Sequence, residues 1–238
     1  MPSGTDRHQC DERASAAGVE PHVPAACADV HRILDTLPTF TSRREARSRL
    51  GFSDGLYCFY ESGESSRHGP EGRIVRVGNH PRSDGTLWRR LGQHYSGGKN
   101  GSVFRKFLGG ALLRHDDPHS PCLEPAPGQG HWERQGAHPC PSCRPVEERV
   151  SALLRERFWF RCLPVADRTE RNALEHQLIA TLAACSACAP SPDWLGRWAY
   201  STTVRRAGMW NSQGVSEVHL NAAGLARLEK LAASGGDP

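Results

Sequence analysis

Two short runs of apolar and aromatic residues stand out in the first third of the chain. GLYCFYE at 55–61 follows the turn signal SDG, and RIVRVGNH at 73–80 has a glycine near its end. The polar stretch between them is typical of a hairpin loop, so the two runs predict paired strands. A similar run, FWFRCLPV at 158–165, predicts a third strand.

Most other apolar positions recur at helical spacing. In TLWRRLGQHY at 86–95, Thr86 is a suitable N-cap. One face of this predicted helix carries Leu87, Arg90, Leu91 and His94. Further helices are predicted at 28–37, 101–114, 146–157, 169–182 and 221–233. The pattern therefore predicts a mixed α/β (α+β) fold with a small, mainly antiparallel three-stranded sheet flanked by helices.

Composition divides the chain into a core and two arms. Residues 1–26 are polar and rich in Pro, Gly and Ala without a period, which predicts a disordered N-terminal arm. A helical lead-in at 27–50, a core domain at 51–215 and a C-terminal helix at 216–238 complete the organisation. Within the core, 115–145 is an insertion rich in Pro, His and Cys. It is long for a structureless connection, so we expect it to be disordered, stapled by a metal or functional.

Charge is unevenly spread along the chain. Residues 67–114 contain ten Arg or Lys residues and two acidic ones, in a chain of net charge +4. Such a segment favours a polyanionic partner such as a nucleic acid, although a solvated, arginine-rich surface would look the same. The candidate backbone contacts are Arg73, Arg89, His94, Lys99, Arg105 and Lys106.

The sequence lacks the marks of export or membrane insertion. No apolar run approaches the roughly 18 residues that span a bilayer, and the N-terminus has no apolar core typical of a secretory signal. We therefore expect a cytoplasmic protein with no membrane partner. Its nine cysteines are then expected to be reduced rather than paired in disulfides.

The helix predicted at 169–182 carries a carboxylate inside its apolar face. On a helical wheel, Glu175 falls between Leu182 and Ile179. A carboxylate in that position costs stability unless something offsets it. It either pairs with Arg171 one turn earlier or serves as a functional group, for example as a cation ligand.

The order of several short motifs resembles a known family. GLY at 55–57 is followed about twenty residues later by RVG at 76–78, then by a helix bearing Arg90 and finally by NALEHQLIATL with Glu175. This order resembles the GIY-YIG endonuclease family. NALEHQLIATL is similar to the glutamate-bearing helix in the nuclease subunit of bacterial excision repair. Six segments resemble one bacterial branch of the family in order, across about residues 50–215.

The resemblance implies a metal-dependent endonuclease that hydrolyses phosphodiester bonds, with DNA as the expected substrate and Mg²⁺ or Mn²⁺ as the cofactor. It makes Glu175 the metal ligand, Arg90 the phosphate-binding group and Tyr57 the base or water-orienting group. These residue types suit the chemistry, because a metal polarises the phosphoryl group, an Arg fork stabilises its charge and a Tyr can orient water.

The resemblance also leaves a departure and some weaker candidates. Arg76 stands where the family's second Tyr is expected and cannot act as a phenolic acid or base, so we expect it to clamp phosphate. His80 and His94 are each able to relay a proton or contact phosphate. Asn211, in the segment MWN, matches a motif of the similar branch and completes the catalytic candidates.

The cysteines raise a separate possibility of zinc. Cys140 with Cys143, and Cys185 with Cys188, form two CxxC pairs that would give a four-thiolate zinc site if they came together. A local site in the insertion would instead use Cys122, His131, His138, Cys140 and Cys143. The remaining alternative is a set of small, reduced, buried thiols.

Two other functional classes compete with the nuclease. In the first, the chain is a non-catalytic nucleic-acid-binding module because Arg76 replaces the family's second Tyr. In the second, the chain is an interaction protein stapled by zinc. Separately, Tyr57 could be an ordinary core aromatic and Arg90 a surface arginine.

Overall fold

A buried central strand organises the protein. The computed structural model describes residues 23–80, 86–123, 132–133 and 143–235. Strand β1 (Gly55–Glu61) is buried along its whole length because it has a neighbour on each side. It pairs antiparallel with β2 (Ile74–Gly78) and with β3 (Phe158–Pro164), which gives the sheet order β2-β1-β3. The predicted three-stranded antiparallel sheet is therefore confirmed.

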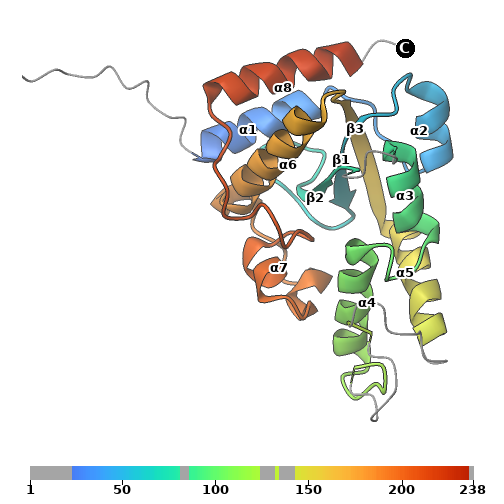
Figure 1. Cartoon of the computed structure of the whole chain (residues 1–238). Coiled ribbons are helices and arrows are strands. Elements are labelled where there is room, and N and C mark those ends of the chain that lie inside the picture. Colours follow the sequence, from blue (N-terminus) through green and yellow to red (C-terminus); the bar gives the residue numbers. More distant parts are fainter. Residues whose placement is uncertain (1–22, 81–85, 124–131, 134–142, 236–238) are drawn as a thin grey trace, which may run out of the picture.

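Helices cover both faces of this sheet (Figure 1). Their bounds are α1 (Val23–Leu34), α2 (Arg43–Arg49), α3 (Leu87–Ser96), α4 (Val103–Asp116), α5 (Cys143–Arg157), α6 (Arg168–Ala183), α7 (Thr202–Ala207) and α8 (Ala222–Gly235), with short 3₁₀ turns η1 (Ser186–Cys188) and η2 (Leu195–Trp198). One hydrophobic cluster joins the sheet to α1, α6 and α8, and a second joins its other face to α3, α4 and α5. The mixed α/β fold class is confirmed.

Local signals placed most helix ends correctly. Thr86 caps α3 by accepting a hydrogen bond from the backbone N–H of Arg89. Asp167 caps α6 by accepting a hydrogen bond from the N–H of Glu170 at 2.7 Å, so α6 begins at Arg168, one residue before the predicted start at 169. These caps satisfy backbone donors that a helix cannot pair within itself.

The insertion at 115–145 is only partly described, and its described part packs against the core. Trp132 is fully buried, and its indole N–H donates to the carbonyl of Lys106 at 2.9 Å. A Cβ at Gly109 would lie 2.0 Å from the Trp132 ring, so the glycine in α4 makes room for this side chain. The predicted arm at 1–26 lies outside the described residues up to position 22, and α1 begins at Val23.

None of the helices in the described ranges is long and apolar enough to cross a membrane.

The end of β1 buries a carboxyl group. Glu61 is 1% exposed, and its Oε2 accepts a hydrogen bond from the indole N–H of Trp194 and another from that of Trp210, each at 3.2 Å. Burial raises the pKa of Glu61 from 4.5 to about 7, because removal from water penalises the charged form. The native protein therefore holds a proton here at pH values where the unfolded chain has lost it.

This carboxyl group predicts a pH-dependent stability. The unfolded Glu61 ionises near pH 4.5 and the folded one near pH 7, so folding stability falls between these values and the full cost applies above pH 7. The gap between 4.5 and about 7 corresponds to roughly 3 kcal/mol. We expect Glu61→Gln to be more stable than wild type by about this amount at pH 8.5 and nearly equal at pH 4, measured by urea unfolding.

The exposed Glu156 on α5 provides the control for that comparison. Because this side chain is exposed, Glu156→Gln should change the free energy of unfolding little at either pH 4 or pH 8.5. An equally flat difference for Glu61→Gln would contradict the assignment of a buried, protonated carboxyl group to Glu61.

Candidate active site

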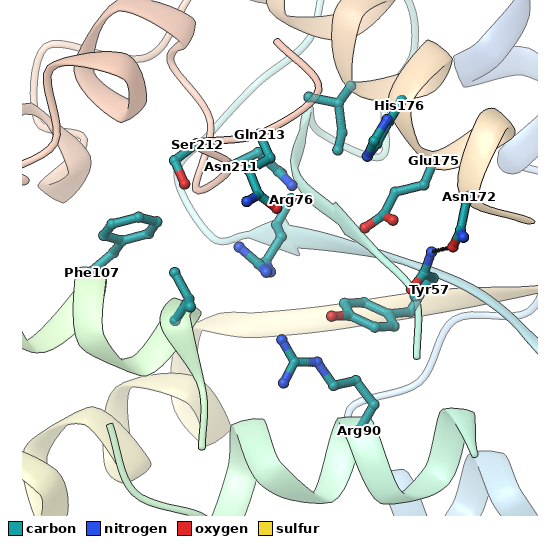
Figure 2. A pocket seen from close by; sticks show the side chains of 13 residues that line it. Tyr57, Arg76, Arg90, Phe107, Asn172, Glu175, His176, Asn211, Ser212 and Gln213 are labelled. Atoms are coloured by element: carbon teal, nitrogen blue, oxygen red, sulfur yellow. Dashed lines mark hydrogen bonds between the residues drawn. The ribbon is translucent and has the colours of Figure 1, made fainter. Parts of the chain in front are cut away.

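A cavity of about 360 Å³ opens beside β2. Figure 2 shows that side chains from separate elements point into a common space there. The walls come from β1 and β2, from α3, α4 and α6, and from the segment after α7. The lining residues are Tyr57, Arg76, Asn79, Arg90, Val103, Phe107, Asn172, Glu175, His176, Ile179, Asn211, Ser212 and Gln213.

Tyr57 reaches this cavity across a glycine. It lies opposite Gly78 in the β1–β2 pairing, and a Cβ at Gly78 would lie 2.2 Å from the Tyr57 hydroxyl oxygen. The hydroxyl is 2.7 Å from Nε2 of His94, and Nδ1 of His94 is 2.8 Å from the Ser102 hydroxyl. The tyrosine oxygen is thus fixed by a chain of two hydrogen bonds that runs through α3 to the N-cap of α4.

His94 in this chain is an uncharged imidazole. It is fully buried between Tyr57 and Ser102. Burial, reinforced by the positive charge of neighbouring arginines, holds the pKa of His94 well below its usual range. One ring nitrogen therefore carries a proton and the other accepts a hydrogen bond, so His94 orients the Tyr57 hydroxyl without adding a charge.

Arg76 approaches the same hydroxyl from β2. Its Nη1 donates to the carbonyl of Trp210, its guanidinium lies 5.0 Å from the Phe104 ring centroid, and it is hydrogen-bonded with Tyr57. Burial lowers the pKa of Arg76, but a guanidinium starts so far above neutrality that it stays charged. A fixed positive charge thus stands beside the tyrosine oxygen.

Arg90 lies one turn before His94 on the same face of α3. Its Nη1 donates to Oε1 of Gln93 at 3.0 Å and to the carbonyl of Gly101 at 3.1 Å. These bonds hold the half-buried guanidinium at the cavity wall, where Figure 2 shows it facing the hydroxyl of Tyr57.

Glu175 enters the cavity from α6, which packs against β2. The carboxylate is half-buried and accepts a hydrogen bond from the backbone N–H of Asn79. Burial raises the pKa of Glu175 above its ordinary value of 4.5, while the positive charges of Arg76 and Arg90 act in the opposite direction. The apolar arc of α6 faces the sheet, and Glu175 lies where that arc meets the cavity. This explains why a carboxylate is found inside an apolar arc.

Glu175 does not form the alternative helical ion pair with Arg171 in this structure. Arg171 is buried and donates from Nη1 to the carbonyls of Val165, at 2.7 Å, and Ala166, at 3.1 Å. The same nitrogen lies 3.4 Å from the carboxylate of Asp54. Arg171 therefore secures the start of α6, and Glu175 is left to the cavity.

Comparison with known protein families identifies the family to which the chain belongs. A family model described as a GIY-YIG domain matches residues 29–236, nearly the whole chain. The chain belongs to the GIY-YIG family. No curated protein and no solved structure gives a significant match. GIY-YIG domains are nuclease domains, so membership implies a nuclease-type function on a nucleic acid in general terms.

The hard oxygen donors of the GIY-YIG cavity suit Mg²⁺ or Mn²⁺. Glu175 supplies one carboxylate, and Asn172, Ser212 and Gln213 add neutral oxygens to the lining. Mg²⁺ is commonly held by one or two carboxylates together with water and substrate phosphate. Two arginines beside one carboxylate leave the cavity positive overall, so a cation fits best when a phosphate enters with it.

Two of the predicted catalytic residues have other positions or tasks. Asn211 lines the cavity, but its side-chain amide pairs with the backbone N–H of Val77 at 3.1 Å and with the carbonyl of Val77 at 2.8 Å, which fixes the segment after α7 to β2. His80 is not among the cavity residues within the described part of the chain. Its Nε2 accepts from the N–H of Gly55 and lies 3.4 Å from Asp54.

Several predicted nucleic-acid contacts lie inside the protein. Arg73 is 1% exposed and paired with Glu64 at 2.7 Å, and Arg105 is 1% exposed and paired with Glu147 at 2.7 Å. Lys99 and His94 are also buried. This burial contradicts the prediction for these four residues, because a phosphate cannot reach them without opening the core. Among the six candidates, those at the surface are the exposed Arg89 and the half-buried Lys106.

The described cysteine of the first CxxC pair, Cys143, does not meet the second pair. Cys143 belongs to the hydrophobic cluster on the α3–α5 side of the sheet, whereas Cys185 and Cys188 belong to the cluster on the α1–α6 side. The Sγ atoms of Cys122 and Cys143 are 3.5 Å apart, as a local site would require. Cys140, His131 and His138 lie outside the described residues, so the local zinc site stays a prediction.

Sequence reasoning missed some residues of the cavity wall. Asn172 and Ile179 lie three residues before and four after Glu175, so helical spacing puts them on its face. His176 directly follows Glu175 in the sequence and also lines the cavity. Asn79 directly follows the RVG motif, and its side-chain N–H donates to Asn172 at 2.8 Å. Ser212 and Gln213 carried no comparable signal, because an irregular segment brings them to the cavity.

Proposed function

We propose that this GIY-YIG protein is a metal-dependent endonuclease that hydrolyses phosphodiester bonds of DNA. The observation that carries the proposal is the convergence of Tyr57, Arg90 and Glu175, from three elements distant in sequence, on one polar cavity. The hydroxyl, the guanidinium and the carboxylate are the groups that this hydrolysis requires, and the cavity is open to a substrate.

The arginines receive the scissile phosphate. Arg90 projects its guanidinium into the cavity from α3, and Arg76 supplies a second, deeper positive charge from β2. A charge-assisted fork of this kind both orients a phosphate and stabilises the negative charge that grows as water attacks. The surface residues Arg89 and Lys106 are placed to contact neighbouring phosphates of the strand.

Tyr57 positions and deprotonates the attacking water. The Nε2–H of His94 donates a hydrogen bond to the tyrosine oxygen when the Ser102 hydroxyl donates one to Nδ1, and the Ser102 oxygen still accepts a hydrogen bond from the N–H of Arg105. The tyrosine oxygen then directs its remaining lone pair at water in the cavity. To act as the base, Tyr57 first releases its hydroxyl proton to solvent, and Arg76 and the His94 donor stabilise the phenolate that then takes a proton from water.

Glu175 is the residue that would hold the divalent cation. When bound, Mg²⁺ or Mn²⁺ polarises the phosphoryl group and neutralises charge on the leaving oxygen. Asn79 holds the carboxylate through its backbone N–H, and Asn172 fixes Asn79 in turn. The carboxylate is therefore oriented before substrate binds.

Nicking of supercoiled plasmid in the presence of Mg²⁺ or Mn²⁺ tests the proposal. We expect wild type to cut and Tyr57→Phe to be slower by about 10²–10³-fold, because the variant keeps the ring but loses the oxygen that activates water. Tyr95 on α3 serves as a matched control. The hydroxyl of Tyr95 is buried without a hydrogen-bond partner, so Tyr95→Phe should cut like wild type.

The same assay separates the nuclease from a binding module. If wild type leaves plasmid intact with either metal, yet shifts DNA in a gel with strong salt dependence, the cavity serves binding alone. Equal cleavage rates for Tyr57→Phe and wild type would show that the Tyr57 hydroxyl takes no part in the reaction.

A further inference from the structure

Four metal-binding side chains meet on the face of the sheet that carries α1 and α6. They are Cys27 of α1, His68 of the β1–β2 loop, and Cys185 and Cys188 at η1, just after α6. One ligand atom from each lies within 4.8 Å of all the others. The cluster belongs to a different hydrophobic core from the Cys122 and Cys143 pair and shares no residue with the cavity lining.

The spacing of the four atoms matches a tetrahedral zinc centre. The Sγ atoms of Cys27 and Cys188 are 3.6 Å apart, and Nε2 of His68 is 3.2 Å from Sγ of Cys185. Four ligands arranged tetrahedrally at zinc–sulfur and zinc–nitrogen bond lengths stand roughly 3.4–3.8 Å from one another. The described distances are close to this range without any bond between the sulfurs.

The surroundings supply hydrogen bonds that thiolates need. The backbone N–H groups of Ala187 and Cys188 both donate to Sγ of Cys185, as the turn of a CxxC pair allows. Sγ of Cys188 lies 3.4 Å from the Ser66 hydroxyl and 3.4 Å from Nε2 of His31. Such outer contacts orient the ligands of a metal and stabilise negative sulfur.

Burial favours a structural role over a redox one. Cys27 is fully buried, and Cys185 and Cys188 are 4% and 8% exposed. Thiols that exchange disulfides with partners must be reached by another thiol, whereas structural zinc sites are closed. Three cysteines and one histidine form a ligand set typical of structural zinc.

We propose that Cys27, His68, Cys185 and Cys188 bind a structural zinc ion. This ion joins α1, the β1–β2 loop and the end of α6, which are distant in sequence. It thereby fixes the end of the helix that carries Glu175, and it is separate from the Mg²⁺ or Mn²⁺ of the cavity.

Metal content of the full chain, produced without a polyhistidine tag, tests this proposal. We expect mass spectrometry of the metals to find zinc in wild type, and Cys185→Ser to lose one zinc ion per chain. Cys162→Ala is the matched control, because Cys162 is a buried free cysteine of β3 outside the cluster, and it should keep its zinc. Glu175→Gln should also keep it, which separates this site from the cavity metal.

Loss of zinc should also appear as lost stability. Removal of the ion with a strong chelator is expected to lower the Tm of wild type on the order of 10 °C, with recovery when Zn²⁺ is restored. The Tm of Cys185→Ser should not respond to either treatment.

Cobalt substitution decides the matter if Cys185→Ser fails to fold. Wild type loaded with Co²⁺ should show thiolate-to-cobalt charge transfer and the visible absorption of a tetrahedral site. His68→Cys should still bind and shift that visible absorption to longer wavelength, because a fourth thiolate replaces the imidazole. Folded wild type that takes up neither zinc nor cobalt under reducing conditions would overturn the proposal, as would iron in place of zinc or undiminished zinc in Cys185→Ser.

Discussion

Replacing Glu175 with glutamine is expected to lower plasmid cleavage by about 10³-fold while making the protein more stable at neutral pH. The loss of cleavage follows because an amide cannot supply the negative charge that holds a divalent cation against two arginines. The gain in stability follows because the charged carboxylate is half-buried and its pKa is raised by burial. A site that costs stability in the free protein is typical of function rather than of packing.

The sign of the stability effect can be measured against pH. Below pH 4.5 the carboxyl group is protonated in both folded and unfolded chains, so Glu175→Gln and wild type should have the same Tm. As pH rises through the raised pKa of the folded state, wild type loses stability relative to the variant. We expect a Tm advantage of roughly 1–3 °C for Glu175→Gln at pH 8.

Glu170 offers a control on the same helix. It lies in the first turn of α6, outside the cavity lining, and pairs with Arg227. Glu170→Gln should cut plasmid at the wild-type rate. Full activity in Glu175→Gln would instead show that the carboxylate is not the metal ligand.

Replacing Gly78 with alanine is expected to reduce cleavage by about 10²-fold although the new methyl group touches no substrate. The Cβ would lie 2.2 Å from the hydroxyl oxygen of Tyr57 and 2.3 Å from its Cζ. Tyr57 must therefore move away from β2, and its 2.7 Å hydrogen bond with His94 is lost or displaced. Overpacking of this kind also costs about 1–3 kcal/mol of stability.

A double-mutant cycle shows whether Gly78 acts through the tyrosine oxygen. In a Tyr57→Phe background that oxygen is already missing, so Gly78→Ala should reduce cleavage much less than it does in wild type. Gly51→Ala is the control, since a Cβ at Gly51 has nothing within 4 Å. Strictly additive losses would mean that Gly78→Ala damages the fold rather than the placement of Tyr57.

The basic segment 67–114 illustrates the limit of charge patterns. Its excess of Arg and Lys predicts a polyanion partner. However, the buried Arg73 and Arg105 form ion pairs with carboxylates of the protein, and Arg76 lines the cavity. Sequence composition gives the number of charged side chains but does not show which of these side chains are exposed to water. The nucleic-acid partner therefore rests on the family and the cavity rather than on this segment.

The sequence by itself determined most of the secondary structure and nominated the candidate site residues. Strand β1 covers GLYCFYE as predicted, and the cap at Thr86 begins α3 as predicted, because turn signals and apolar periodicity act within a few residues. Motif order selected Tyr57, Arg90 and Glu175, and the misplaced carboxylate on the apolar face of α6 was visible on a helical wheel.

Only the tertiary structure decided which distant side chains become partners. It places His94 within hydrogen-bond distance of Tyr57 and pairs the Asn211 side chain with the backbone of β2. It also brings Cys27 and His68 to the CxxC pair at η1. No local pattern marks such partners, because their separation is set by how helices pack on the two faces of the sheet. Local structure follows from short-range sterics and hydrogen bonding, whereas burial and pairing of charged or metal-binding groups follow from the packed whole.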